Sequence, residues 1–144
     1  MSDSLQNGEN FSFDVPARAC FRSAVGSFIS SICEELRTQE RLNEESSHQI
    51  MSAFLEGFNN VVTHAYPGTA TGRVELLISV KTEYISLSLF DEGEGFDFEA
   101  IPVPELDSLP EGGMGIYIMK NFMDRVEYKR DNEKNMLYLE KRYV

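Results

Sequence analysis

The sequence has 144 residues, of which 42% are hydrophobic, and its 10 Phe and 6 Tyr can fill the core of one domain. Its formal net charge is −11, from 24 acidic and 13 basic residues, so nucleic acids and membranes are poor direct partners. The two cysteines have no metal-ligand or disulfide spacing, residues 1–14 lack the basic flank and apolar segment typical of a leader, and no apolar run is long enough to span a membrane. We therefore expect a soluble, cytoplasmic protein.

The first part of the chain predicts a strand and a helix after a loose end. Residues 1–10 are polar and are expected to form a flexible N-terminus, followed by a single domain over residues 11–144. Residues 11–15, "FSFDV", alternate apolar and polar side chains before a proline, which is typical of an edge strand. Over residues 17–37, apolar side chains recur at three- and four-residue steps, which predicts a long helix.

A second apolar stripe predicts a second helix over residues 50–65, after a polar connection. The proline and glycine of "YPG" close this helix. The arc expected to face the core contains Phe54, Leu55, Phe58, Val61, Val62 and Ala65.

The second half of the chain predicts two hairpins, separated by a loop and a short helix. Each hairpin consists of two β-rich runs joined by a short polar turn: residues 73–80 with 84–90, and residues 125–130 with 135–144. Residues 91–113 are rich in proline and glycine and predict a lid-like loop, followed by a short helix around residues 116–123. Helices on one face of a mainly antiparallel sheet make an α+β two-layer sandwich.

The second helix carries Glu56, Asn60, Thr63 and His64 on the side opposite its apolar arc. Two interpretations stay open, a solvated face and a ligand site, and the poor helix formers Asn and Thr slightly favour the ligand site. Glu56 and Asn60 lie one turn apart, so a carboxylate and an amide oxygen can address a proton and a Mg²⁺ ion of the same ligand. A histidine such as His64 near a helix end more often caps or packs.

Two glycine segments add weaker signals. In "DEGEGF", Asp91 ends a strand and precedes Gly93 and Gly95, so the backbone can fold over a flat ligand while the carboxylate accepts a hydrogen bond from an exocyclic amine. A plain turn with glycine at positive φ explains the same residues. In "EGGMGIYIMK", the glycine-rich residues 112–115 precede a helix, where backbone N–H groups can bind phosphate, although a flexible entry to the helix has the same composition.

Taken in order, "EGFNN" with "HAY", then "DEGEGF", then "GGMGIYIM" resemble the three nucleotide-binding boxes of the GHKL ATPase superfamily, whose fold is the Bergerat ATP-binding fold. The chain is similar in particular to bacterial anti-sigma factor serine kinases, through an opening "VPA", "NxxxHAY" and "GIYIMKNFMDRVEY". The resemblance covers residues 11–144.

The resemblance implies that ATP and Mg²⁺ are the cofactors of the domain. It assigns Mg²⁺ binding to Asn60, polarisation of the attacking hydroxyl to Glu56, and recognition of adenine to Asp91. The other residues that it assigns to nucleotide binding are His64, Gly93, Gly95, Gly113, Met114 and Gly115.

The function implied by the resemblance is that of an anti-sigma factor with serine/threonine protein kinase activity. Such a protein sequesters a sigma factor and phosphorylates a serine of an anti-sigma factor antagonist, and two copies pair into a homodimer through an exposed strand such as residues 11–15. The alternative is a nucleotide-binding module that sequesters its partner without kinase activity, and a third hypothesis is an interaction domain with no ligand. Gly112 stands where many relatives carry a basic residue, so kinase activity is a weaker expectation than ATP binding.

Overall fold

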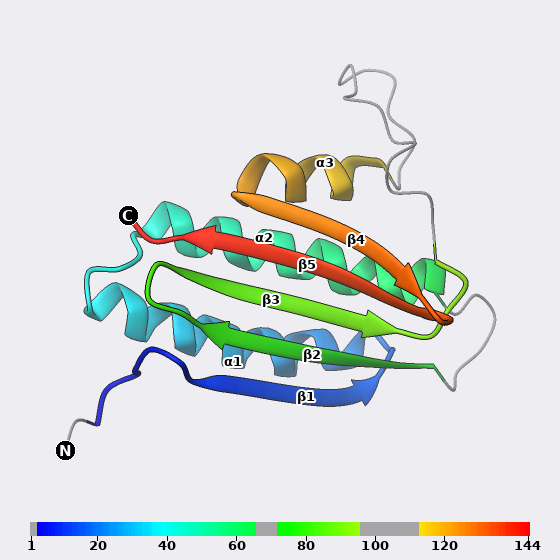
Figure 1. Ribbon diagram of the computed structural model, residues 1–144, viewed down its shortest axis with the longest axis horizontal. Helices are drawn as coiled ribbons and strands as arrows, with labels where there is room; N and C mark the ends of the chain where they lie inside the picture. The colour runs from blue at the N-terminus through cyan, green and yellow to red at the C-terminus, as the bar shows by residue number, and fades with distance from the viewer. Residues whose placement is uncertain (1–2, 66–71, 96–112) are drawn as a thin grey trace.

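The computed structural model describes residues 3–65, 72–95 and 113–144. The helices lie on one face of a single antiparallel sheet (Figure 1). The elements in chain order are β1 Asn10–Pro16, α1 Cys20–Thr38, α2 Glu44–Asn60, the π-helical turn η1 Val61–Ala65, β2 Arg73–Val80, β3 Tyr84–Asp91, α3 Gly113–Phe122, β4 Arg125–Asp131 and β5 Lys134–Arg142. The strand order is β1-β2-β3-β5-β4, and every neighbouring pair is antiparallel. The predicted α+β two-layer sandwich is confirmed.

The core lies between the sheet and the helices, because successive side chains of a strand point to opposite faces. In β2, Val74, Leu76 and Ile78 are buried on the helical side, while the alternate residues Glu75 and Leu77 are exposed. The edge strand β1 joins this core through two phenylalanines that stack edge-on against Phe28 of α1, with ring centroids 5.2 and 4.9 Å apart: Phe11 and Phe13. None of the helices in the described part of the chain is long and apolar enough to cross a membrane.

The start of α2 corrects the sequence prediction, which placed the helix from residue 50. The helix begins at Glu44, because Asn43 caps it: the Asn43 side-chain oxygen accepts a hydrogen bond of 2.8 Å from the backbone N–H of Ser46. Glu44 and Glu45 then place negative charge in the first turn, where the helix dipole favours it. The capping signal, rather than the apolar stripe, therefore sets this boundary.

The predicted core arc of α2 is confirmed for Phe54, Phe58 and Val61, while Val62 is half-buried and the side chain of Ala65 lies outside the described structure. Phe54 and Phe58 are 0% and 1% exposed, with ring centroids 5.8 Å apart, whereas Leu55 is 37% exposed. Successive helical residues are about 100° apart, so Leu55 lies on the flank of a stripe centred on Phe54 and Phe58. The expectation that Leu55 is a core residue is wrong.

Residues 3–9 precede β1, and the Gln39 side chain donates a hydrogen bond of 2.7 Å to the carbonyl of Leu5. The predicted short helix starts at Gly113, three residues before the expected position.

The two cysteines are free; Cys20 is exposed, and burial raises the pKa of the Cys33 thiol to about 12.

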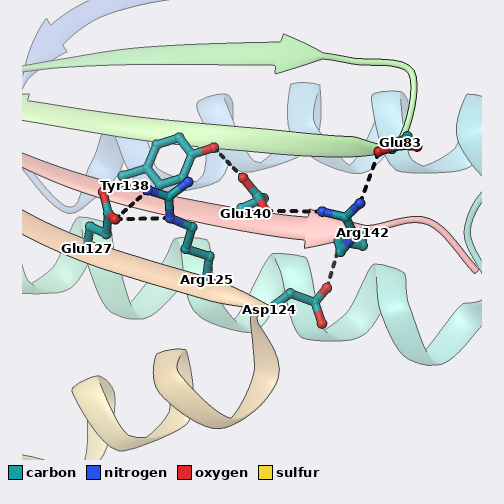
Figure 2. A network of polar contacts seen from close by, with 7 residues as sticks. All are labelled: Glu83, Asp124, Arg125, Glu127, Tyr138, Glu140 and Arg142. Atoms are coloured by element: carbon teal, nitrogen blue, oxygen red, sulfur yellow. Dashed lines mark hydrogen bonds and ion pairs between the residues drawn. The ribbon is translucent and has the colours of Figure 1, made fainter.

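The face of the sheet away from the helices carries a polar network at one end of β5 (Figure 2). Tyr138 donates a hydrogen bond of 2.6 Å to the buried Glu140, and burial together with this contact raises the pKa of Tyr138. Arg142 lies 3.9 Å from the other oxygen of Glu140 and 3.1 Å from Glu83 in the β2–β3 turn. The Arg142–Glu83 contact joins the end of β5 to the β2–β3 turn, whereas the contacts of Glu140 with Tyr138 and Arg142 lie within β5.

A pair of neighbouring substitutions tests the orientation of α2. Phe54→Ala is expected to lower the free energy of unfolding by about 3–5 kcal/mol, because it empties a fully buried site. Leu55→Ala, the matched control, is expected to change it by less than about 1 kcal/mol. Urea denaturation followed by circular dichroism measures both. Equal losses would show that the two side chains share the core arc and would contradict the observed helix rotation.

Candidate functional site

The candidate site lies where the end of α2, the end of β3 and the β4–β5 hairpin meet. Asn60 ends α2 and Asp91 ends β3, and their exposed fractions are only 8% and 7%. One small pocket is lined by residues of all these elements, among them Gly57, Asn60, Asp91, Gly95, Tyr128 and Leu137. Its cavity volume is about 10 Å³, about the space for one water molecule. A larger ligand therefore requires its walls to move apart.

Gly57 sets how closely α2 approaches the sheet. A Cβ atom at this position would lie 3.0 Å from Cδ2 of Leu137 on β5 and 3.6 Å from Cδ2 of Leu89 on β3. A glycine inside a helix lowers the stability of the helix, and the close contact with the strands explains why a glycine is nevertheless present here. The contact brings the last turn of α2 against the strands that carry the rest of the site.

The structure corrects the predicted exposure of Asn60. The sequence placed it on the side opposite the core, yet it is buried, because the flank of α2 that carries it faces the pocket beside Asp91 and Gly95. Its side-chain Nδ2 is a buried donor with no hydrogen-bond partner in the described part of the chain. Leaving such a donor unpaired costs about 1–3 kcal/mol, which a ligand with an acceptor atom can recover.

Glu56 lies one turn before Asn60 and is half-buried. A Cβ atom at Gly115, in the first turn of α3, would lie 2.5 Å from Oε2 of Glu56, so a side chain at this position would displace the Glu56 carboxylate from its present place. The structure thus brings the predicted catalytic carboxylate to the glycine-rich start of α3. Gly113 and Met114 open the same helix, and their side-chain surroundings lie outside the description.

The helix predicted to run to residue 65 changes form after Asn60. Residues 61–65 form η1, a π-helical turn, a feature that occurs often at functional sites. Thr63 is exposed on it, as the sequence predicts, whereas the side chain of His64 lies outside the described structure. The change of helix type was not visible in the apolar stripe, because five residues are too few to distinguish a π from an α period.

The turn after β3 is organised around one oxygen of Asp91. Oδ1 of Asp91 accepts a hydrogen bond of 2.9 Å from the backbone N–H of Gly93 and one of 2.8 Å from Nδ2 of Asn135. Gly95 follows at φ 76°, in the left-handed region that favours glycine. The alternative of a turn with glycine at positive φ is therefore correct for Gly95, and the same turn also presents a buried carboxylate to the pocket.

Two residues of the hairpin were missed by the sequence analysis, Asn135 and Arg130. Asn135 is fully buried on β5 directly opposite Asp91, and its Nδ2 also donates to the carbonyl of Gly93 at 3.0 Å. Arg130 of β4 donates through Nη1 to Oδ1 of Asn135 and to the carbonyl of Gly93, both at 3.1 Å, and to the carbonyl of Glu94. Their neighbours are fixed by the pairing of β3 with β5, which are not consecutive in the chain, so local patterns could not reveal them.

The described residues contain no group of three or more His, Cys, Asp and Glu side chains that could hold a metal ion. A divalent cation at this site would therefore rest on few protein ligands, of which Asn60 is the predicted one. Of the predicted lid over residues 91–113, residues 96–112, which include Gly112, lie outside the described residues.

Comparison with known proteins agrees with this geometry. Residues 23–141 match the family described as histidine kinase-like ATPase domain. The chain belongs to this family. A family assignment of this kind implies nucleotide binding.

Two relatives in sequence and one solved structure are similar to this chain. The chain is 24% identical to the serine-protein kinase RsbW of Oceanobacillus iheyensis, over 97% of this chain and 90% of the relative. It is 34% identical to an anti-sigma F factor of Bacillus thuringiensis, over 74% of this chain and 70% of the relative. Among solved structures, the RsbU and RsbW domains of Rv1364c from Mycobacterium tuberculosis share the fold, with a TM-score of 0.67, 12% identity, and coverage of 94% of this chain and 32% of that chain.

A pair of glycine substitutions tests how tightly the Asp91 turn is packed. Gly95→Ala and Gly8→Ala both force alanine into positive φ, at 76° and 87° respectively. At Gly95 the added Cβ atom would also lie 2.7–3.0 Å from side-chain atoms of Arg130, Asn135 and Tyr128. At Gly8 no atom lies within 4 Å of the added Cβ atom. We expect Gly8→Ala to cost about 1–2 kcal/mol from the backbone alone, and Gly95→Ala about 1–3 kcal/mol more. Urea denaturation measures both, and equal costs would contradict the packed turn.

Proposed function

We propose that this protein is an ATP-dependent protein serine kinase that also acts as an anti-sigma factor. The observation that carries the proposal is the buried, unpaired Nδ2 of Asn60 in the pocket that also contains Asp91, with Glu56 one turn away against Gly115. A buried amide donor without a partner costs free energy, and a ligand that accepts a hydrogen bond from it gives a reason to keep it.

The base of the nucleotide is proposed to bind at Asp91. One oxygen of its carboxylate already accepts two hydrogen bonds, and the carboxylate has further acceptor capacity for an exocyclic amine such as that of adenine. Gly57 and Gly95 line the same pocket without side chains, which leaves room for a flat ring once the walls separate. Val61 and Leu137 supply apolar contacts to the ring.

The phosphates are proposed to bind between the end of α2 and the start of α3. Asn60 would offer its amide oxygen to Mg²⁺ and its amide nitrogen to an acceptor atom of the nucleotide, which pairs the orphan donor. Mg²⁺ prefers oxygen ligands and neutralises phosphate charge when bound. Gly113, Met114 and Gly115 open α3, whose first backbone N–H groups point away from the helix and favour anions.

Glu56 is proposed to receive the proton of the attacking serine hydroxyl. The hydroxyl oxygen forms a bond to the γ-phosphorus, the bond from this phosphorus to the β–γ bridging oxygen breaks, ADP leaves, and the hydroxyl proton passes to the Glu56 carboxylate. The position of Glu56 beside Gly115 supports this role, because it holds the carboxylate next to the proposed phosphate-binding turn.

The partners proposed are a sigma factor and an anti-sigma factor antagonist that carries the acceptor serine. The names of the two relatives, a serine-protein kinase and an anti-sigma F factor, support both halves of this assignment. The net charge of −11 favours partners with basic surfaces and disfavours direct contact with nucleic acid. We also propose that two copies pair into a homodimer, as the family resemblance implies.

The second candidate is a nucleotide-binding anti-sigma module without kinase activity. Residues 91–119 contain no Lys or Arg, and Gly112 stands where many relatives have a basic residue, so few cations are available to stabilise charge on a transferring phosphoryl group. The two candidates share the ATP site and differ only in the transfer step.

Variants of α2 separate binding from transfer. Asn60→Ala is expected to weaken Mg²⁺-ATP binding at least about tenfold, because it removes both proposed polar contacts. Asn59→Ala is the matched control: Asn59 accepts a hydrogen bond from Arg22 of α1 and does not line the pocket, so binding should be unchanged. Glu56→Gln should bind ATP normally but transfer the phosphoryl group about 10²- to 10⁴-fold more slowly.

Calorimetry measures the binding, and radiolabelled ATP with soluble extract of the source organism detects phosphoserine formed on a partner. Binding in the wild type without any transfer would favour the second candidate. Absence of ATP binding by folded wild-type protein would overturn both.

A further inference from the structure

We propose that Asn135 and Arg130 are positioning residues that hold the Asp91 carboxylate in the orientation needed to recognise the base. The inference rests on the proposed nucleotide site. It adds two residues of the β4–β5 hairpin that hold the Asp91 side chain in place. Neither residue belongs to the three sequence motifs, and both were found only through the pairing of β5 with β3 and β4.

Asn135 fixes which oxygen of Asp91 is free. Its Nδ2 donates to Oδ1 of Asp91 at 2.8 Å and to the carbonyl of Gly93 at 3.0 Å, so both amide hydrogens are engaged. The backbone N–H of Gly93 donates to the same Oδ1 at 2.9 Å. Two donors lie on Oδ1 and no hydrogen bond from the described residues reaches Oδ2, so Oδ2 is the acceptor that we assign to a ligand. Because Asn135 is fully buried, this arrangement is shielded from water that would loosen it.

Arg130 fixes the orientation of the Asn135 amide. Its Nη1 donates to Oδ1 of Asn135, so the amide oxygen faces the guanidinium and the amide nitrogen faces Asp91. The same guanidinium nitrogen donates to the carbonyls of Gly93 and Glu94, which holds the turn after β3 against the hairpin. A hydrogen bond from a charged donor is stronger than a neutral one, so one exposed arginine can hold the turn in place.

The consequence is selectivity for the group at position 6 of a purine. A fixed acceptor oxygen favours an amino group there, rejects an oxo group, and gains nothing from a hydrogen atom. If Asn135 and Arg130 only stabilised the fold, their removal would weaken all purine nucleotides alike. If they position Asp91, their removal would weaken the amino-bearing nucleotide in particular.

The experiment compares Mg²⁺-ATP with the Mg²⁺ complex of purine riboside triphosphate, which lacks the 6-amino group, by calorimetry. In the wild type we expect ATP to bind about 10- to 100-fold more tightly, the range for a hydrogen bond to a charged group. Asn135→Leu, which removes the amide at similar volume, should reduce this ratio to within about threefold of unity.

Arg130→Met tests the same inference at an exposed position, where loss of folding is not a concern, and should lower the ratio at least about threefold. Lys129→Met is the matched control: Lys129 is the next residue of β4, is exposed, and lies on the opposite face of the strand, so the ratio should stay that of the wild type. Thermal melts confirm that each variant is folded.

The outcomes separate the inference from the proposed function. A wild-type ratio that persists in both Asn135→Leu and Arg130→Met would overturn the inference and leave the proposed function standing. A wild type that binds neither nucleotide, or binds the two equally, would overturn the proposed role of Asp91 and with it the inference.

Discussion

The close contact between α2 and the sheet at Gly57 is the constraint on which the site depends. A side chain at this position would press on Leu137, so the glycine lets the helix lie directly on β5. Asn60, less than one turn further along, is thereby carried into the same pocket as Asp91. At a second close contact, the Glu56 side chain of the same helix lies against Gly115 at the start of α3. Glycines at two helix contacts therefore assemble a site whose polar residues come from distant parts of the chain.

The fold could be predicted from the sequence because its signals are local. Hydrophobic periodicity and turn residues determine the strands and helices, and helices segregated on an antiparallel sheet follow from their order. The errors have identifiable causes. The start of α2 depends on the Asn43 cap. The exposure of Leu55 depends on how the helix is rotated about its axis, which the positions of apolar residues in the sequence do not determine.

The candidate site was predictable only in part. Glu56, Asn60 and Asp91 were predicted as site residues because they belong to ordered motifs, although burial of Asn60 was the opposite of the expectation. Asn135 and Arg130 were not found, because they reach the Asp91 turn through the non-consecutive pairing of β5 with β3. Residues 91–119 contain no Lys or Arg, so the proposed phosphate site would depend on backbone N–H groups, on a metal ion and on cations from other segments of the chain.

The central claim is that the end of α2, the turn after β3 and the start of α3 form one nucleotide site. Hydrogen–deuterium exchange of the wild-type protein, with and without Mg²⁺-ATP, tests it most directly, because bound nucleotide slows the opening of the backbone that it contacts. The account predicts slower exchange together in residues 56–63, 91–95 and 113–117, with little change in α1. Protection confined to other segments, or to one of these three alone, would contradict it.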